Sequence, residues 1–162
     1  MKPKDKPIQA KAELTIPASP AWFGAIRELI ICFSNESGFS SRESGSIALA
    51  VDEALSNVHR HGYDRSNTEL IELSLETTWA TKLTPCNIII CIEDRGKQVE
   101  IELIRSRDLN KVRPGGLGVH LIQSIMDKAT WTHRKNGGMR LVLEKHGSSL
   151  LESTDEPQEN EN

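Results

Sequence analysis

The stretch VDEALSNVHRHGY, residues 51–63, decides the fold. It reads as the end of a helix, and it places a carboxylate, an amide and an imidazole at successive four-residue intervals: Glu53, Asn57 and His61. Four residues turn an α-helix through about 400°, so each side chain is displaced by only about 40° from the one before it. The three side chains therefore form one polar stripe along a single edge of the helix.

The helix that carries this stripe is predicted to run from about Ser41 to His61, with Gly62 as its C-cap. Its apolar residues fall on one face at helical spacing: Ile47, Ala50, Val51, Ala54, Leu55 and Val58. The polar stripe flanks this face and does not oppose it, so it can line a pocket whose other wall is a β-sheet. A solvated helix edge is the ordinary alternative. His59 points away from the stripe and is expected to be solvated.

The segments around this helix predict a protein with both helices and strands. Ser19 is expected to cap a helix that starts at Pro20. Strands are predicted at 11–18, 68–80 and 85–94, a further helix at 119–129, and a hairpin with the turn sequence NGG over 130–146. The apolar run within 85–94 is typical of a buried central strand. Residues 98–103 fit either a short strand or a loop, and the polar, glycine-rich segment 105–118 predicts a mobile loop.

The composition fits one folded domain. The chain of 162 residues is 37% hydrophobic and 27% charged, which predicts a single core and not a disordered chain. The formal net charge of −3 argues against nucleic-acid binding by bulk electrostatics. No apolar run approaches the roughly 20 residues that span a bilayer, and no apolar stretch follows the charged N-terminus as in a secretory signal. These features predict a cytoplasmic protein without direct contact with nucleic acid or membrane.

Cysteine usage and the chain ends fit the same interpretation. The three cysteines, Cys32, Cys86 and Cys91, are expected to be buried, reduced thiols. The three tryptophans, Trp22, Trp79 and Trp131, are expected in the core or at an interface and not as ligand platforms. The domain is predicted to cover 11–146, after a flexible N-terminus at 1–10 and before an acidic, disordered tail at 147–162.

Two short motifs follow the stripe along the chain. Asp94 and Gly96 come directly after the apolar strand, where a carboxylate can accept a hydrogen bond from an amino group and a glycine lets another group approach the backbone. An ordinary turn is the alternative there. Gly115, Gly116 and Gly118 precede a helix, where free backbone N–H groups can bind an anion. They do not form a Walker A loop, because no Lys-Ser or Lys-Thr follows them, and a plain flexible loop is the alternative.

Taken together and in this order, the three motifs resemble the N, G1 and G2 boxes of the GHKL ATPase superfamily, whose Bergerat fold is shared by gyrase and histidine kinases. The segments AVDEALSNVHRHGY and GGLGVHLIQSIMD are most similar to those of the anti-sigma factor serine/threonine kinases, the RsbW-like branch. The resemblance covers roughly residues 11–146. It implies an α/β (α+β) two-layer sandwich, in which a mixed, largely antiparallel sheet is covered by helices on one face.

The resemblance also implies a role for each motif residue. Asn57 would bind Mg²⁺, and Glu53 would be the general base. Asp94 would hold the adenine amine of ATP, with Gly96 beside it and His61 in the nucleotide pocket. The phosphates would be met by Gly115, Gly116, Leu117 and Gly118, under a lid formed by 105–118.

Such a protein would use ATP to phosphorylate a serine or threonine on a small STAS-domain anti-anti-sigma partner. Many members of the branch also bind a sigma factor, and the resemblance leaves a homodimer open. Two alternatives stay open as well: a non-catalytic ATP-binding module that sequesters a partner, and a small GHKL ATPase or histidine-kinase-like catalytic domain. The chain departs from the family pattern in KQVEIE (97–102) and at Met139, which follows the hairpin glycines.

Overall fold

A computed structural model of the chain describes residues 8–82, 84–105 and 117–147. Within these residues, five strands form one sheet in the order β1-β2-β3-β5-β4, and every neighbouring pair is antiparallel. The strands are β1 (Gln9–Pro17), β2 (Leu70–Thr78), β3 (Asn87–Glu93), β4 (Lys128–His133) and β5 (Met139–His146). The helices are α1 (Pro20–Ser37), α2 (Ser41–Asn57), the π-helical turn η1 (Val58–Gly62), α3 (Ile101–Arg105) and α4 (Leu117–Ile125).

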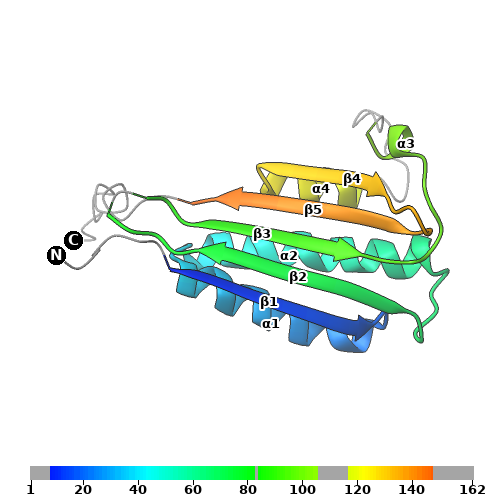
Figure 1. The fold of residues 1–162 in the computed structure, drawn as a ribbon, viewed down its shortest axis with the longest axis horizontal. Helices are drawn as coiled ribbons and strands as arrows, with labels where there is room; N and C mark the ends of the chain where they lie inside the picture. The colour runs from blue at the N-terminus through cyan, green and yellow to red at the C-terminus, as the bar shows by residue number, and fades with distance from the viewer. Residues whose placement is uncertain (1–7, 83, 106–116, 148–162) are drawn as a thin grey trace, which may run out of the picture.

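The sheet and the longer helices form two layers. Helices α1, α2 and α4 lie on one face of the sheet, and none of the described helices covers the other face (Figure 1). The predicted two-layer sandwich is confirmed, although the described sheet is antiparallel throughout and not mixed. Most of the predicted lid, 106–116, and the predicted tail from residue 148 lie outside the described residues. Across the described ranges, no helix has both the length and the apolar character needed to cross a bilayer.

Side chains that alternate between buried and less buried positions along the strands form the core between the two layers. One cluster of buried residues joins β3 and α2: Ile88, Ile90 and Ile92 with Ile47, Val51 and Leu55. The opposite side of β3 carries Ile89 and Cys91, which are only partly buried. The central position predicted for this strand is confirmed, but its burial is one-sided because the described helices pack on a single face of the sheet.

The two long helices begin at residues whose sequences favour a helix start. In α2 the Ser40 side chain accepts a hydrogen bond from the Glu43 N–H at 3.3 Å, and the Glu43 carboxylate accepts one from the Ser40 N–H at 2.9 Å. This reciprocal pair is a capping box. Helix α1 starts at Pro20 behind Ser19, whose side chain makes no capping hydrogen bond, and it ends at Gly38 with a φ of +112°. Both predicted helix starts are confirmed.

The C-terminal end of α2 differs from the expectation. The helix continues as η1, in which the Tyr63 N–H donates to the Val58 carbonyl at 3.0 Å, so Gly62 lies inside the last turn and is not its cap. His59 is not solvated either, because its Nδ1 lies 2.7 Å from the Ala18 carbonyl oxygen. A helical wheel shows that His59 points away from the stripe, but it cannot show that the β1–α1 connection packs on that side. Single π turns within α-helices are frequent at functional sites.

Three further expectations are wrong in detail. Residues 98–103 are neither a strand nor only a loop, because α3 begins at Ile101. Helix α4 starts at Leu117 and ends at Ile125, since the chain from Lys128 onward pairs with β5 as strand β4. The cysteines are not uniformly buried: Cys86 is buried, Cys91 is partly buried and Cys32 is exposed.

Candidate functional site

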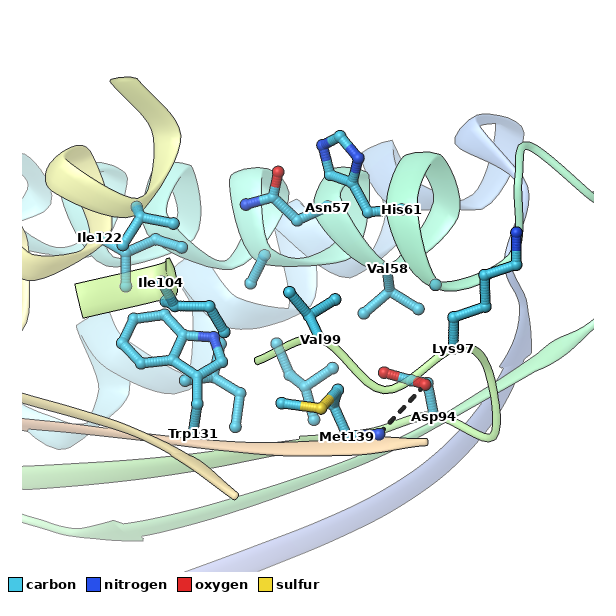
Figure 2. A pocket seen from close by; sticks show the side chains of 15 residues that line it. Asn57, Val58, His61, Asp94, Lys97, Val99, Ile104, Ile122, Trp131 and Met139 are labelled. Carbon is cyan, nitrogen blue, oxygen red and sulfur yellow. Dashed lines mark hydrogen bonds between the residues drawn. The ribbon is translucent and has the colours of Figure 1, made fainter. Parts of the chain in front are cut away.

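A pocket of about 380 Å³ opens between the edge of α2 and the sheet (Figure 2). Asn57 and His61 line it from the helix side, and Asp94 lines it from the end of β3. The rest of the wall is largely apolar and includes Val58, Ile92, Val99, Ile104, Val119, Ile122, Trp131, Met139 and Leu141. The volume is in the range of small-molecule sites. The fold therefore brings the amide and imidazole of the stripe together with the carboxylate that follows the buried strand.

Asp94 is the buried carboxylate of this pocket, with only 3% of the residue exposed. Its Oδ1 accepts hydrogen bonds from the backbone N–H groups of Gly96 at 2.8 Å and Met139 at 3.3 Å. Burial raises the pKa of this carboxyl above its ordinary value, while the two hydrogen bonds and the charge of Arg134 act in the opposite direction. Within the described part of the chain, no hydrogen bond reaches Oδ2. That oxygen is left for a donor in the pocket.

Two glycines allow backbone segments to meet around Asp94. A Cβ on Gly96 would overlap the carbonyl group of Gly62, and a Cβ on Gly138 would overlap the carbonyl oxygen of Asp94. The Gly62 carbonyl also accepts a hydrogen bond from the Lys97 N–H at 2.9 Å. The group that approaches Gly96 closely is thus the end of η1, which forms part of the pocket wall.

Gly96→Ala is expected to lower the free energy of unfolding by about 1–3 kcal/mol, the usual cost of forcing an extra methyl group into a packed site. The methyl group would meet backbone atoms of Gly62 that cannot rotate away. Thermal unfolding measures the effect, with roughly 2–4 °C of melting temperature lost per kcal/mol in a chain of this size. Gly45→Ala is the matched control, because its Cβ would meet nothing within 4 Å in the interior of α2. Equal melting temperatures for the two variants would contradict this account of Gly96.

Glu53 lies one turn before Asn57, at the rim of the pocket and not in its wall. Its Oε1 accepts a hydrogen bond from Arg60 Nη2 at 2.9 Å, and the same nitrogen lies 3.4 Å from Asn57 Oδ1. The Glu53 side chain remains 25% exposed and the Arg60 side chain 41% exposed. One guanidinium group therefore spans the carboxylate and the amide of the polar stripe.

The first turn of α4 lies against the same carboxylate. A Cβ on Gly118 would overlap the carboxylate of Glu53, so a larger residue there would have to displace the Glu53 side chain. Leu117 is 79% exposed beside it. Gly115 and Gly116 lie outside the described residues. The described part of the predicted phosphate loop thus lies next to Glu53, at the open side of the pocket.

Sequence reasoning missed the part of the pocket wall that the hairpin supplies. Trp131 packs against the core, as expected of a tryptophan, but it also lines the pocket. Met139, a departure from the family pattern, lines the pocket too and donates its N–H to Asp94. The hairpin register was the available signal: it pairs Trp131 with Leu141, which places both on one face with Met139.

The side chains present fit an adenine nucleotide and a magnesium ion. Asp94 Oδ2 can accept a hydrogen bond from an exocyclic amine, and Trp131 and Met139 offer aromatic and polarisable surface to a base. Among the described residues, no group of three or more His, Cys, Asp or Glu could hold a metal ion. Mg²⁺ commonly takes only one or two protein oxygens and completes its shell with phosphates and waters. The Asn57 side-chain oxygen fits that requirement.

Comparisons with known proteins agree with this geometry. The family model of the histidine kinase-like ATPase domain matches residues 16–145. The chain is similar to the serine-protein kinase RsbW of Oceanobacillus iheyensis, with 28% identity over 142 residues that cover 83% of this chain and 85% of that protein. It is also similar to the serine-protein kinase RsbW of Halalkalibacterium halodurans, with 26% identity over 141 residues that cover 82% and 81% of the two proteins.

A solved structure has the same fold. The crystal structure of the RsbU and RsbW domains of a Mycobacterium tuberculosis protein matches with a TM-score of 0.55 at 17% identity, covering 86% of this chain and 34% of that one. This likeness concerns the fold alone. The family match, in contrast, runs from the end of β1 to the end of β5 and includes the whole pocket. The chain belongs to the histidine kinase-like ATPase domain family.

Proposed function

We propose that this chain is an ATP-dependent protein serine/threonine kinase of the anti-sigma factor type, acting on a small STAS-domain anti-anti-sigma protein. Membership in the ATPase domain family implies ATP binding. The relatives at 26–28% identity are serine-protein kinases, which supports the finer assignment of a protein substrate. The kinase domain would correspond to 11–146 and act in the cytoplasm.

One observation carries the proposal. A carboxylate, Glu53, lies one helical turn before the amide of Asn57 at the rim of a pocket whose wall holds the buried carboxylate of Asp94. A protein that only binds ATP does not need a carboxylate at that rim. A protein that transfers a phosphoryl group to a hydroxyl does need a group there to orient the hydroxyl and accept its proton.

Each residue has a distinct task in this proposal. Asp94 accepts a hydrogen bond from the adenine amine, and Asn57 holds Mg²⁺ through its side-chain oxygen. Bound Mg²⁺ offsets the negative charge of the phosphates. Glu53 orients the serine or threonine hydroxyl and takes its proton as the hydroxyl oxygen bonds to the γ-phosphorus. The bond between that phosphorus and the β,γ-bridging oxygen breaks in the same transfer, and ADP leaves with the electron pair. Arg60 holds Glu53 Oε1, so the second carboxylate oxygen, Oε2, is the one that would take the proton while this ion pair persists.

The same ion pair favours a second candidate function. With Glu53 engaged by Arg60, the domain could bind ATP and sequester a partner without transferring phosphate. Incubation with radiolabelled ATP and a candidate STAS-domain protein separates the possibilities. Label on a serine or threonine of the partner supports the kinase, bound but unreacted ATP supports the module, and free phosphate alone supports a small ATPase. A sigma factor and a second copy of the chain are further partners in this proposal, to be identified by co-purification.

ATP binding is expected to change the tryptophan fluorescence of the protein, because Trp131 lines the pocket. Most of the nucleotide-dependent change should disappear in Trp131→Phe. Trp22→Phe is the matched control, since Trp22 is 51% exposed at the start of α1 and does not line the pocket. A fluorescence titration with ATP measures both variants. A full nucleotide-dependent change in a folded Trp131→Phe protein would mean that ATP binds elsewhere.

A further inference from the structure

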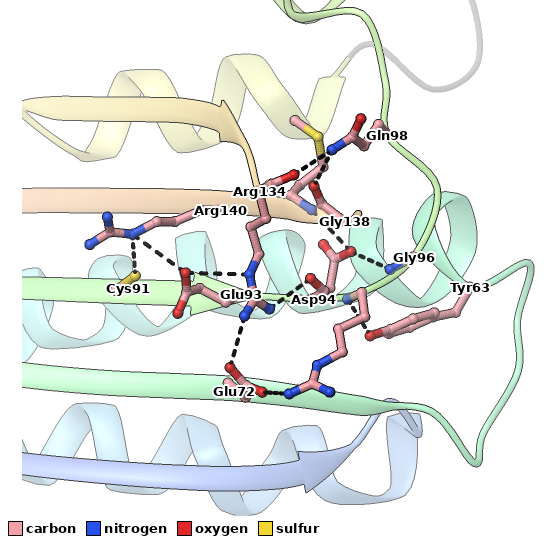
Figure 3. A network of polar contacts seen from close by, with 12 residues as sticks. Tyr63, Glu72, Cys91, Glu93, Asp94, Gly96, Gln98, Arg134, Gly138 and Arg140 are labelled. Carbon is pink, nitrogen blue, oxygen red and sulfur yellow. Dashed lines mark hydrogen bonds and ion pairs between the residues drawn. The ribbon is translucent and has the colours of Figure 1, made fainter. Parts of the chain in front are cut away.

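Arg134, in the turn between β4 and β5, contacts the backbone of Asp94, whose carboxylate lines the pocket (Figure 3). Its Nη1 donates a hydrogen bond of 2.9 Å to the backbone carbonyl oxygen of Asp94. Its remaining nitrogens face two carboxylates of the sheet, with Nε 3.6 Å from Glu93 and Nη2 3.4 Å from Glu72. The Arg134 side chain is only 24% exposed. A partly buried guanidinium group thus joins β2, β3 and the hairpin at a single point.

The hairpin turn is itself fixed in place at this point. The Arg134 carbonyl accepts a hydrogen bond of 2.8 Å from the Gln98 side chain, whose Nε2 also lies 3.3 Å from the Gly138 carbonyl. Gly138 lets the hairpin lie directly against the Asp94 carbonyl. These contacts hold the guanidinium group against the backbone of Asp94, while the carboxylate of Asp94 faces the pocket on the other side (Figures 2 and 3).

We propose that Arg134 is a positioning residue for nucleotide recognition, which fixes the backbone of Asp94 so that its carboxylate faces the adenine amine. This inference rests on the proposed function for its consequence in ATP binding. Its physical basis is separate, because Arg134 hydrogen-bonds to the Asp94 backbone and a nearby cation favours the ionised form of a buried carboxylate. The charge of Arg134 acts on the Asp94 pKa in this direction. Arg134 does not line the pocket itself and would act only through Asp94.

Other charged or titratable groups lie on the elements that meet near Asp94. They are His61 and Tyr63 in and after η1, Arg95 and Lys97 after β3, Glu72 on β2, Glu93 on β3, and Arg140 on β5. Most of these cations have other partners: Lys97 pairs with Asp64, Arg95 with Glu72, and Arg140 with Glu93. Of the cations in the described structure, Arg134 is the one whose side chain hydrogen-bonds to Asp94. Removal of Arg134 should therefore affect Asp94 more than removal of any of these other cations.

The test follows the Asp94 carboxyl by ¹³C NMR as pH is lowered, in the nucleotide-free protein. Removing a cation disfavours the ionised carboxylate, so Arg134→Met is expected to move the Asp94 titration to higher pH. Arg140→Met is the matched control, because Arg140 lies on the same sheet face and pairs with Glu93 but does not touch Asp94. The Asp94 titration should be unchanged in Arg140→Met. Equal titrations in Arg134→Met and Arg140→Met would overturn the inference.

Calorimetry with Mg-ATP across pH gives the functional readout. The ionised carboxylate is the stronger acceptor for the amine, because its hydrogen bond is charge-assisted. The loss of ATP affinity on acidification should therefore begin at higher pH in Arg134→Met than in the parent protein. At neutral pH the affinity should fall about two- to tenfold, the range of one net hydrogen bond. An ATP pH profile in Arg134→Met that matches that of Arg140→Met would also overturn the inference.

A further variant keeps the test decisive if Arg134→Met does not fold. Arg134→Lys keeps the charge but loses the planar fork that reaches Asp94, Glu93 and Glu72 together. It should leave the Asp94 titration near that of the parent protein and still weaken ATP binding. Parent-like ATP affinity in Arg134→Lys would overturn the positioning role. If the parent protein itself fails to bind ATP, the proposed function falls, while the nucleotide-free titration still decides whether Arg134 controls Asp94.

Discussion

Glu53→Ala is expected to lose about 10²–10⁴-fold in the rate of phosphoryl transfer, the usual contribution of a positioned general base. Its ATP affinity should stay within a few-fold of the parent value, because Glu53 lies at the rim of the pocket and not among its lining residues. The effect belongs to the transfer step, since the Glu53 carboxylate would contact the incoming hydroxyl and not the nucleotide. The measurement is single-turnover phosphorylation of the STAS-domain partner at saturating Mg-ATP.

Two further variants define what the Glu53 result means. Glu53→Gln keeps the size of the side chain and can still accept a hydrogen bond from Arg60, so parent-like folding with lost transfer would assign the defect to proton acceptance. Asn57→Ala should instead weaken Mg-ATP binding, because it removes the proposed magnesium ligand. The two residues lie on one helix edge and share contact with Arg60, so they form a matched pair. Transfer at the parent rate by Glu53→Ala would move the base to another residue.

Much of the fold was predictable because the local signals and the tertiary packing agree. The four-residue spacing of Glu53, Asn57 and His61 predicts one helix edge. In the structure Asn57 and His61 line the pocket together with Asp94, which follows β3. The NGG turn predicts the β4–β5 hairpin, and Gly137 and Gly138 adopt the positive φ angles that such a turn requires. In these segments, local geometry and burial favour the same conformation.

The errors occur where contacts between distant segments decide the structure. His59 looks solvated on a helical wheel, yet the Ala18 carbonyl, distant in sequence, lies within hydrogen-bond distance of its ring. The close approach of Gly62 to Gly96 follows from the meeting of two chain segments that no periodicity relates. Arg134 is a turn arginine in the sequence, and only the sheet order β2-β3-β5-β4 brings it against Asp94. The chemical role of such residues can be recognised only when the topology of the fold is known.

Asp94→Asn is expected to weaken ATP binding by roughly 1.5–3 kcal/mol, or more than tenfold, because a charge-assisted hydrogen bond to the adenine amine is lost. The geometry at Asp94 makes the exchange unfavourable in either orientation of the amide. Oδ1 already accepts from two backbone N–H groups, those of Gly96 and Met139, so the amide oxygen is needed at that position. The amide nitrogen must then face the pocket, where it presents a donor to the donor of the adenine amine.

Calorimetric titration with Mg-ATP measures the loss, and Asp64→Asn is the matched control. Asp64 is an exposed carboxylate that pairs with the pocket-lining Lys97. It therefore tests whether any negative charge near the pocket would have the same effect. Asp64→Asn should bind ATP with nearly the parent affinity, because an exposed ion pair contributes little. A nucleotide whose base lacks the exocyclic amine should bind the parent protein weakly and lose little further affinity in Asp94→Asn, since the hydrogen bond is absent in both cases. If a folded Asp94→Asn protein binds ATP as tightly as the parent, adenine is not recognised by this carboxylate and the nucleotide must lie differently in the pocket.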